Sequence, residues 1–448
     1  MPAKTVNLLV SLPQELDIGK PIKHEHSLEL PVTPPKVVPV CPHCHSAGCV
    51  SKGSDGFQSI RHVPSGNVGV FLTFKKQRFY CPECRVSFTH HYSWQHHPLP
   101  ITDALYLSIL SDLSRPVPIP DIAAKNCVTD NIVRGVLKSI DIPRCPALPE
   151  IVCVDDFHGN AGVYNPKRKK WDAPVFQTCV VDGASGRIID ILRDRSSATV
   201  QEFFLSFPES QRKNVKFYSC DMSGIYAAAA RKIFPDAVLC IDKFHVVQWL
   251  NLAVDAVRRR LQNEFRNDTK KYQKLKDSRL MLLTKECNQR AYWEAYGYEE
   301  KLARLQTLLA EFPDLCEVFD ALHEYHFFCK ADTEPVRRLR LTEWVNKYLS
   351  SDVEEVRNAA KTVQNWKENI LNSFTHGITN GPVEALNNQI KRLKKISCGV
   401  HDFESFRKRI LLCFGTTSFI RNQYTIFGEK RASKSNKIYI KKEELNHD

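Results

Sequence analysis

Two Cys-x-x-Cys turns stand near the start of the chain, Cys41 with Cys44 and Cys81 with Cys84, and 36 residues separate them. Zinc takes four ligands at tetrahedral angles, and each such turn supplies two thiolates from one tight loop. Because the β-rich stretch GVFLTFKKQRFY lies between the turns, the pattern predicts a zinc ribbon over residues 41–95. It leaves no open ligand position, which indicates a structural Zn²⁺. Two unrelated cysteine pairs are the alternative.

Further cysteines and histidines need an explanation of their own. Cys49, His43 and His45 lie close to the first turn and are alternative ligands for one zinc position. The chain has 16 cysteines, and many of the others sit inside apolar runs, as Cys153 and Cys220 do. Free cysteine packs as a small hydrophobe, so these residues are expected to be reduced core residues rather than a disulfide framework.

The charge balance is basic. Lys and Arg number 63 against 50 Asp and Glu, which gives a net charge of +13. This excess favours a polyanionic partner, most simply nucleic acid. No apolar run approaches the ~18 residues of a membrane span, and Pro13 breaks the opening apolar stretch too early for a signal peptide. We therefore expect a cytoplasmic protein without a membrane partner.

Changes in composition divide the chain. Seven prolines between positions 13 and 42 indicate a poorly packed leader. Short β-rich runs alternate with helical stretches from about residue 150 to 245, which is typical of an α/β domain. The expected segments are an extended Pro-rich leader (1–40), the zinc ribbon (41–95), a helix-turn-helix domain (100–145), an α/β segment (150–250), a helical segment (251–375), a return to the α/β domain (376–425) and a basic tail (426–448).

The segment 119–140 has the pattern of a helix, a short turn and a second helix, with Thr129 able to cap the second one. In a DNA-binding helix-turn-helix the second helix enters the major groove, which would place Asp130, Asn131 and Arg134 near bases or phosphates. An ordinary helical hairpin is the alternative. The nearby zinc ribbon and the basic chain favour DNA binding.

Acidic residues follow two apolar runs, and a third lies in a helix. IVCV ends in Asp155 and Asp156, VKFYSC ends in Asp221, and Glu384 lies in a helix that starts after TNGP. Acids at the ends of central strands, with a third from a flanking helix, can converge on Mg²⁺ or Mn²⁺. Two such ions clamp the attacking and leaving oxygens in phosphoryl transfer. A surface or capping role is the alternative for any one of these acids.

The helix that carries Glu384 has a polar face. Glu384, Asn388, Lys391 and Lys395 follow the spacing i, i+4, i+7, i+11, so they share one side of the helix. A carboxylate for metal and lysines for the DNA backbone would then point the same way. An amphipathic helix with a solvated basic face is the alternative.

These motifs together resemble the DDE transposases of bacterial insertion sequences, specifically the ISL-three family. The matching stretches are VDDF at 154–157, YSCDMSGIY at 218–226, IDKFHVVQWLN at 241–251, DAVRRR at 255–260 and TNGPVEALNNQIK at 379–391. The resemblance implies a multi-domain α/β protein whose catalytic domain has a ribonuclease-H-like fold. It also implies a catalytic triad of Asp155, Asp221 and Glu384 for metal-dependent cutting and joining of DNA.

The resemblance assigns supporting roles as well. The family motif usually reads Asp-Glu-Phe, so the catalytic role goes to Asp155, and Asp156 is its nearest competitor. Asp242 and His245 match an Asp-x-x-His signature of related transposases that supports the site, although a structural histidine is an equal alternative. The long gap between Asp221 and Glu384 indicates a helical insertion at 251–375.

The implied function is recognition of terminal inverted repeats by the ribbon and the helix-turn-helix, followed by strand transfer into target DNA. Lys167 and Arg168, in a predicted hairpin turn, would hold flanking phosphates. Concerted cutting of two ends predicts homo-oligomers on DNA. The alternatives are a DNA-binding regulator that no longer cuts and a nuclease that hydrolyses without joining strands.

Overall fold

The computed structural model describes residue 12 and residues 16–159, 164–165, 167, 169–171, 176–283, 298–397, 400 and 402–415. These residues fall into two compact units. The first unit holds the described residues up to 145, those of 158–175 and those from 387 onward. The second unit holds residues 146–157 and the described residues of 176–386. Arg168 and the basic tail expected at 426–448 lie outside the described residues.

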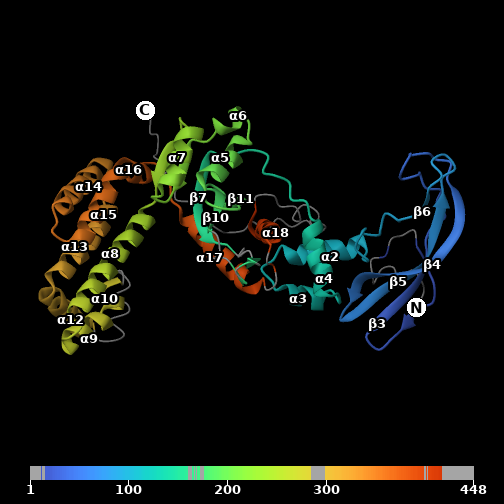
Figure 1. Ribbon diagram of the computed structural model, residues 1–448, viewed down its shortest axis with the longest axis horizontal. Helices are drawn as coiled ribbons and strands as arrows, with labels where there is room; N and C mark the ends of the chain where they lie inside the picture. Colours follow the sequence, from blue (N-terminus) through green and yellow to red (C-terminus); the bar gives the residue numbers. More distant parts are fainter. Residues whose placement is uncertain are drawn as a thin grey trace, which may run out of the picture. The chain divides into compact units, whose positions relative to one another are not determined.

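The first unit begins with a β-sheet. Its strands are β1 (Asp17–Ile18), β2 (Ile22–Lys23), β3 (Ser27–Thr33), β4 (Val50–Ser65), β5 (Val68–Tyr80) and β6 (Ser87–Thr89). The main path is β1-β3-β5-β4, with β3 parallel to β5 and β4 antiparallel to it (Figure 1). Alternate residues of β5, among them Leu72 and Phe74, face one hydrophobic core. In this core the ring of Phe74 packs edge-on against the rings of Tyr92 and Trp94.

The interpretation of residues 1–40 as a poorly packed leader is wrong for Ser27–Thr33. This segment pairs in parallel with β5, and Leu30 and Val32 are buried in the core of the sheet. Pro31 is compatible with a strand because the ladder loses only the hydrogen bond that its missing N–H would have made. The interpretation relied on the number of prolines and missed the alternating apolar residues Leu30 and Val32, which pack in the core of the sheet.

Helices complete the first unit: α2 (Asp103–Leu113), α3 (Ile119–Lys125), α4 (Asp130–Ser139) and α18 (Phe403–Phe414). The helices α2, α3 and α4 pack on one another, and α18 packs on α2 and α4. Arg409 of α18 is buried, and its guanidinium donates hydrogen bonds to the backbone carbonyls of Leu113, Arg115 and Val117. Thr129 is the N-cap residue of α4, but its side chain makes no capping hydrogen bond, contrary to the sequence-based expectation.

The second unit contains a mixed sheet with the strand order β11-β10-β7-β12-β13 (Figure 1). Its strands are β7 (Ile151–His158), β10 (Phe176–Asp182), β11 (Arg187–Leu192), β12 (Phe217–Cys220) and β13 (Val238–Ile241). The strand β12 is parallel to both β7 and β13, whereas β10 and β11 are antiparallel to each other. The carboxyl ends of β7, β12 and β13 therefore meet at one edge of the sheet.

Helices make up most of the rest of the second unit. They are α5 (Ser197–Leu205), α6 (Glu209–Arg212), α7 (Gly224–Ile233), α8 (Lys243–Glu264), α9 (Thr269–Asp277), α10 (Arg279–Leu283), α12 (Tyr298–Glu311), α13 (Pro313–Cys329), α14 (Glu334–Leu349), α15 (Glu354–Asn365) and α16 (Lys367–Thr375). The helices α13 and α15 pack beside α8, and α16 packs on β13 (Figure 1). The helix α17 (Gly381–Ile396) starts in the second unit. No helix in the described part of the chain combines the length and the apolar character that crossing a membrane requires.

Candidate zinc centre and active site

Four cysteine thiols gather at the end of the first sheet. The Sγ atoms of Cys41, Cys44, Cys81 and Cys84 all lie within 4.8 Å of one another. The Sγ atoms of Cys41 and Cys84 are 3.5 Å apart, and so are those of Cys44 and Cys81. At a Zn–S bond length of ~2.3 Å, tetrahedral ligands lie about 3.8 Å from each other. This spacing fits a zinc ion in a zinc ribbon.

Backbone hydrogen bonds favour the ionised form of two of these thiols. The amide of Cys44 lowers the pKa of Cys41 to about 6, against the opposing effect of burial. The amide of Cys84 lowers the pKa of Cys81 in the same way. Thiolates are the form that binds zinc. Cys49, one of the alternative ligands, is instead buried beside the cluster with its thiol directed to the carbonyl of Ser46, and His43 and His45 are exposed.

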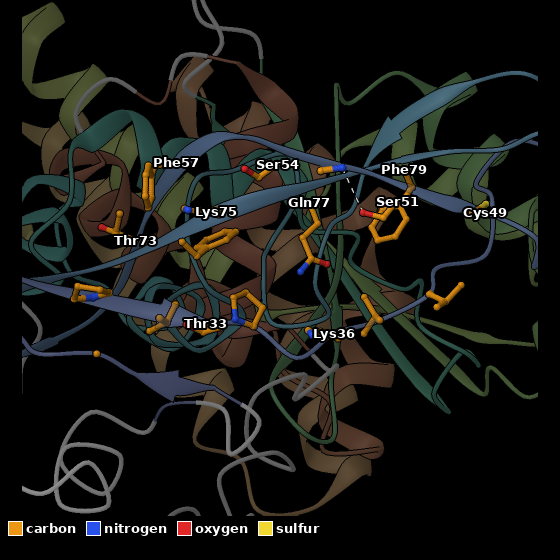
Figure 2. Close-up of a pocket in the computed structure, with 18 residues that line it drawn as sticks. Thr33, Lys36, Cys49, Ser51, Ser54, Phe57, Thr73, Lys75, Gln77 and Phe79 are labelled. Carbon is orange, nitrogen blue, oxygen red and sulfur yellow. Dashed lines mark hydrogen bonds between the residues drawn. The ribbon is translucent and has the colours of Figure 1, made fainter.

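A groove of about 740 Å³ crosses the face of the first sheet beside this centre. Thr73, Lys75 and Gln77 follow one another along β5 and line it, as Figure 2 shows. Phe57 of β4 is 68% exposed, and the Lys75 ammonium lies 5.6 Å from the centre of its ring. With Lys36 on the opposite wall and no carboxylate among the lining residues, the groove is electropositive. The sequence pattern gave no signal for this concavity, because its lining residues come from separate segments that meet only in the folded chain.

The predicted recognition helix is α4. Its buried side carries Val133, Val136 and Leu137, and Asn131 is exposed. Arg134 is half-buried, with its guanidinium 3.8 Å from the carboxylate of Asp130 one turn earlier. At this distance the ion pair is weak.

Asp155 and Asp221 lie side by side at the edge of the second sheet. Cys153 of β7 pairs with Ser219 of β12 in a parallel ladder, and each acid stands two residues further along its strand. One oxygen of Asp155 accepts a hydrogen bond from the amide of Asp156 at 2.8 Å. One oxygen of Asp221 accepts from the amide of Ser223 at 3.0 Å.

The two acids resist ionisation in the folded chain. Burial raises the pKa of Asp155 to about 6, and the charges of Asp221 and Asp156 add to the rise. Burial also raises the pKa of Asp221, with a further contribution from Asp156. The positive charge of His245 lowers both pKa values, but by less than burial raises them. A cation bound between the carboxylates would relieve this repulsion, so the donor set fits a hard divalent metal.

Asp156 has a cationic partner. Its carboxylate accepts a hydrogen bond from the guanidinium of Arg195 at 2.9 Å. The same guanidinium lies 4.2 Å from the centre of the Phe176 ring, which fixes its orientation. Arg195, in the loop after β11, was not among the residues predicted from sequence. Its position shortly after the apolar run of β11 was the one sequence signal that could have suggested a basic partner for the acids.

Asp242 directly follows β13, and both of its carboxylate oxygens accept hydrogen bonds. One oxygen accepts from the amide of Phe244 at 3.0 Å and caps α8. The other accepts from the hydroxyl of Thr379 at 2.7 Å and from the amide of Asn380. The side-chain amide of Asn380 lies 3.4 Å from Nε2 of His245. Asp242 and His245 thus tie the segment before α17 to the edge of the sheet.

The neighbouring helix α16 strengthens this connection. The hydroxyl of Ser373 donates to the carbonyl of Ile241 at 2.7 Å, and the side-chain amides of Asn369 and Asn372 donate to the carbonyl of Leu239. These bonds satisfy the outer edge of β13, which would otherwise be an open edge strand. The chain is therefore held continuously from β13 through α16 to the start of α17.

Glu384 lies in the first turn of α17, and its amide donates to the carbonyl of Asn380 at 3.0 Å. It is half-buried. In the described chain its carboxylate does not join those of Asp155 and Asp221 in a group of ligand atoms within 4.8 Å of one another. The structure thus brings Asp155, Asp156, Asp221 and His245 together and places Glu384 on the helix that Asp242 holds.

The predicted DNA-binding lysines are exposed. Lys391 and Lys395 lie on the solvent side of α17, as does Asn388, while Ile390 and Leu393 are buried. Lys167 is exposed in the turn between β8 (Tyr164–Asn165) and β9 (Lys170–Trp171), which pair as a short antiparallel hairpin.

Comparison with known proteins gives matches over most of the chain. A family model described as transposase matches residues 152–410, more than half of the chain. A model described as the zinc finger of the transposases of IS204, IS1001, IS1096 and IS1165 matches residues 38–84.

Individual relatives agree with these models. The transposase for insertion sequence element IS1001 of Bordetella parapertussis is 23% identical over 397 residues, which cover 87% of this chain and 92% of that protein. The transposase for insertion sequence element IS1557 of Mycobacterium tuberculosis is 34% identical over 91 residues, 20% of each chain.

Proposed function

The chain belongs to the ISL-three family of DDE transposases, and we propose that it binds the terminal inverted repeats of an insertion sequence and catalyses metal-dependent DNA cleavage and strand transfer. The observation that carries this proposal is the pair of partly buried carboxylates, Asp155 and Asp221, which stand opposite each other where the parallel pairing of β7 and β12 ends and whose pKa values burial raises. The strand order, with β7 in the middle of the sheet, supports a ribonuclease-H-like catalytic fold. The helices of residues 251–375 then form an insertion within this fold.

Asp155, Asp221 and Glu384 are the proposed metal ligands. A bound Mg²⁺ or Mn²⁺ pair would neutralise the acids and stabilise the charge that develops on the phosphate in the transition state. Asp156 is a weaker candidate because Arg195 already neutralises it. Asp242 and His245 act on the site through the position of Thr379 and Asn380, one turn before Glu384.

The proposed reaction has two phosphoryl transfers. Water attacks a phosphodiester at the end of the element, and the bond to the departing 3′-oxygen breaks, which leaves a free 3′-hydroxyl. This hydroxyl then attacks a phosphodiester of the target, and the target's own 3′-oxygen leaves. Each step forms one P–O bond and breaks one, so no covalent link between protein and DNA is needed.

The first unit is the proposed reader of the element ends. The zinc ribbon fixes the groove that contains Lys36 and Lys75, and this electropositive surface suits a DNA backbone. Asn131 and Arg134 of α4 would contact the major groove, as in a helix-turn-helix. Lys167, Lys391 and Lys395 would hold phosphates at further points. Two ends cut in concert require a homo-oligomer on DNA.

Cleavage of a labelled duplex that carries the element end tests the proposal, with wild type compared with Asp221→Asn in Mg²⁺ or Mn²⁺. We expect metal-dependent nicking at the element boundary and joining to target DNA by the wild type only, with end binding retained by both proteins. Specific binding without cleavage by either protein would support the regulator instead. Nicking without joining would support a nuclease.

A further inference from the structure

The solvent side of α8 carries large apolar side chains. Phe244 is 38% exposed, Trp249 is 48% exposed and Leu252 is 62% exposed. The opposite side of α8 is buried against α13 and α15, so burial in the described fold does not account for these three residues (Figure 1). A cluster of exposed apolar side chains on one face is typical of an interaction surface.

This surface begins at the acidic site. His245, Trp249 and Leu252 follow the spacing i, i+4, i+7, so they share one side of α8. The helix α8 begins directly after Asp242, and the parallel pairing of Cys220 with Ile241 places Asp242 at the same sheet edge as Asp221, so this side of α8 starts beside the acidic site. Trp249 and Leu252 then lie about 6 Å and about 10 Å further along the helix axis. A few nucleotides, at ~3.4 Å of rise each, span this distance.

The charges along α8 indicate the partner. Lys243 precedes the apolar residues and Arg259 follows them. The acid between them, Asp255, is buried and paired with Arg258 and Arg259. Between Lys243 and Arg259 the helix therefore exposes an indole and no carboxylate, which suits a polyanion that also presents flat apolar faces. An unpaired nucleobase flanked by phosphates has this chemistry, and base–aromatic stacking stabilises such contacts.

We propose that Trp249, supported by Leu252, stacks on an unpaired base of the DNA strand next to the phosphodiester that is cut at the acidic site. This inference rests on the proposed function, because the base belongs to the DNA end that is cut. Trp249 is a positioning residue here. It stabilises the distorted DNA that brings the scissile phosphate to Asp155 and Asp221, and it takes no part in bond making or breaking.

The test measures coupling between the indole and one base. All proteins carry Asp221→Asn, so that they bind element ends without cutting them. A series of duplex ends is prepared in which each nucleotide near the cleavage position is made abasic in turn, and the dissociation constant is measured for each. With Trp249 present, we expect one abasic position to weaken binding about 5- to 150-fold, the value that ~1–3 kcal/mol of stacking corresponds to.

The variants sharpen this test. Trp249→Ala should weaken binding to the intact end by the same factor and show no further loss at the abasic position, whereas Trp249→Phe should retain most of the coupling. Phe327→Ala is the matched control, since Phe327 is an aromatic residue of α13 that is 58% exposed. It should leave binding and the abasic profile unchanged. Unaltered thermal unfolding of each variant checks the fold.

Different outcomes separate the two proposals. If the Asp221→Asn protein with Trp249 does not bind element ends specifically, the proposed function fails. If it binds and the wild type cleaves, but no abasic position couples to Trp249, the stacking inference is wrong. Trp249→Ala made in the chain that retains Asp221 gives a further outcome. Loss of cleavage together with a smaller oligomer by mass photometry, without coupling to a base, would also overturn the inference, because the surface would then bind a second copy of the chain.

Discussion

Replacement of Asp155 by Asn should make the metal-free protein more stable. Burial and the neighbouring acids raise the pKa of Asp155 from 3.8 to about 6. At ~1.4 kcal/mol per pKa unit, ionisation of this carboxyl costs about 3 kcal/mol more in the folded chain than in the unfolded chain at neutral pH. Asn carries no charge and keeps an oxygen for the amide of Asp156. After allowance for partial solvent screening, we expect a gain of about 1–3 kcal/mol.

The pH dependence of this gain follows from the raised pKa. Below about pH 4 the carboxyl is protonated in both folded and unfolded wild type, so the variant has no advantage. Between about pH 4 and pH 6 the unfolded chain loses its proton first, and the folded wild type loses stability relative to the variant. Above about pH 6 the gain is complete.

Differential scanning calorimetry on the full chain with EDTA measures the effect, because it can separate the transitions of the two units. Asp156→Asn is the control and should give a smaller gain or none, since it removes a carboxylate that Arg195 neutralises. Adding Mg²⁺ should stabilise the wild type by mass action and leave Asp155→Asn nearly unchanged. If Asp155→Asn is no more stable than wild type at pH 7 in EDTA, the carboxylates do not repel each other and the metal-site reasoning is refuted.

Four further predictions concern other parts of the molecule. Cys81→Ser should lose bound zinc, measured by a chromogenic chelator, and end binding should fall by at least tenfold in a gel-shift assay; retention of one zinc per chain would contradict the ligand assignment. Asp242→Ala should reduce cleavage about 10- to 100-fold, because Thr379 and Asn380 lose their anchor, while end binding stays within twofold of wild type. Asp255→Asn should destabilise the chain at neutral pH. Burial raises the pKa of Asp255, but its hydrogen bond and ion pair with Arg258 lower it more, so this stability is present above about pH 4 and disappears as acid protonates the carboxylate; equal urea midpoints of variant and wild type at pH 7 would refute it. Lys391→Gln and Lys395→Gln should each reduce the salt dependence of DNA binding by about one ion, and an unchanged slope of log Kd against log salt would exclude phosphate contacts.

Local patterns predicted the parts of this chain whose chemistry depends on neighbours in sequence. The Cys-x-x-Cys turns predicted the four thiols that the structure gathers, because each turn fixes two ligands by itself. The apolar runs before Asp155 and Asp221 form strands, and parallel pairing places the two acids opposite each other, although β7 continues past Asp155 to His158. The helices Ile119–Lys125 and Asp130–Ser139 also follow the apolar spacing of the sequence.

Features that depend on distant pairing were not predictable in this way. Leu30 and Val32 are buried only because β3 pairs with β5, and proline-rich sequence gives no sign of that partner. Arg195 reaches Asp156 across the sheet edge, 39 residues along the chain. Thr379 and Asn380 meet Asp242 at a separation of 137 and 138 residues. In each case the sequence contains several residues with which the side chain could interact, and only the folded chain shows which of them it contacts.

Three aspartates show why the partner decides the role. Asp221 and Asp242 each directly follow a buried parallel strand, and Asp155 lies within β7 at the position opposite Asp221. Asp242 uses both oxygens for hydrogen bonds from Phe244, Thr379 and Asn380, so a metal could bind it only by breaking them. Asp155 and Asp221 are left with raised pKa values. In the proposed metal site the third ligand is therefore Glu384, which lies outside the strand ends, and Asp242 holds the start of the helix that carries it.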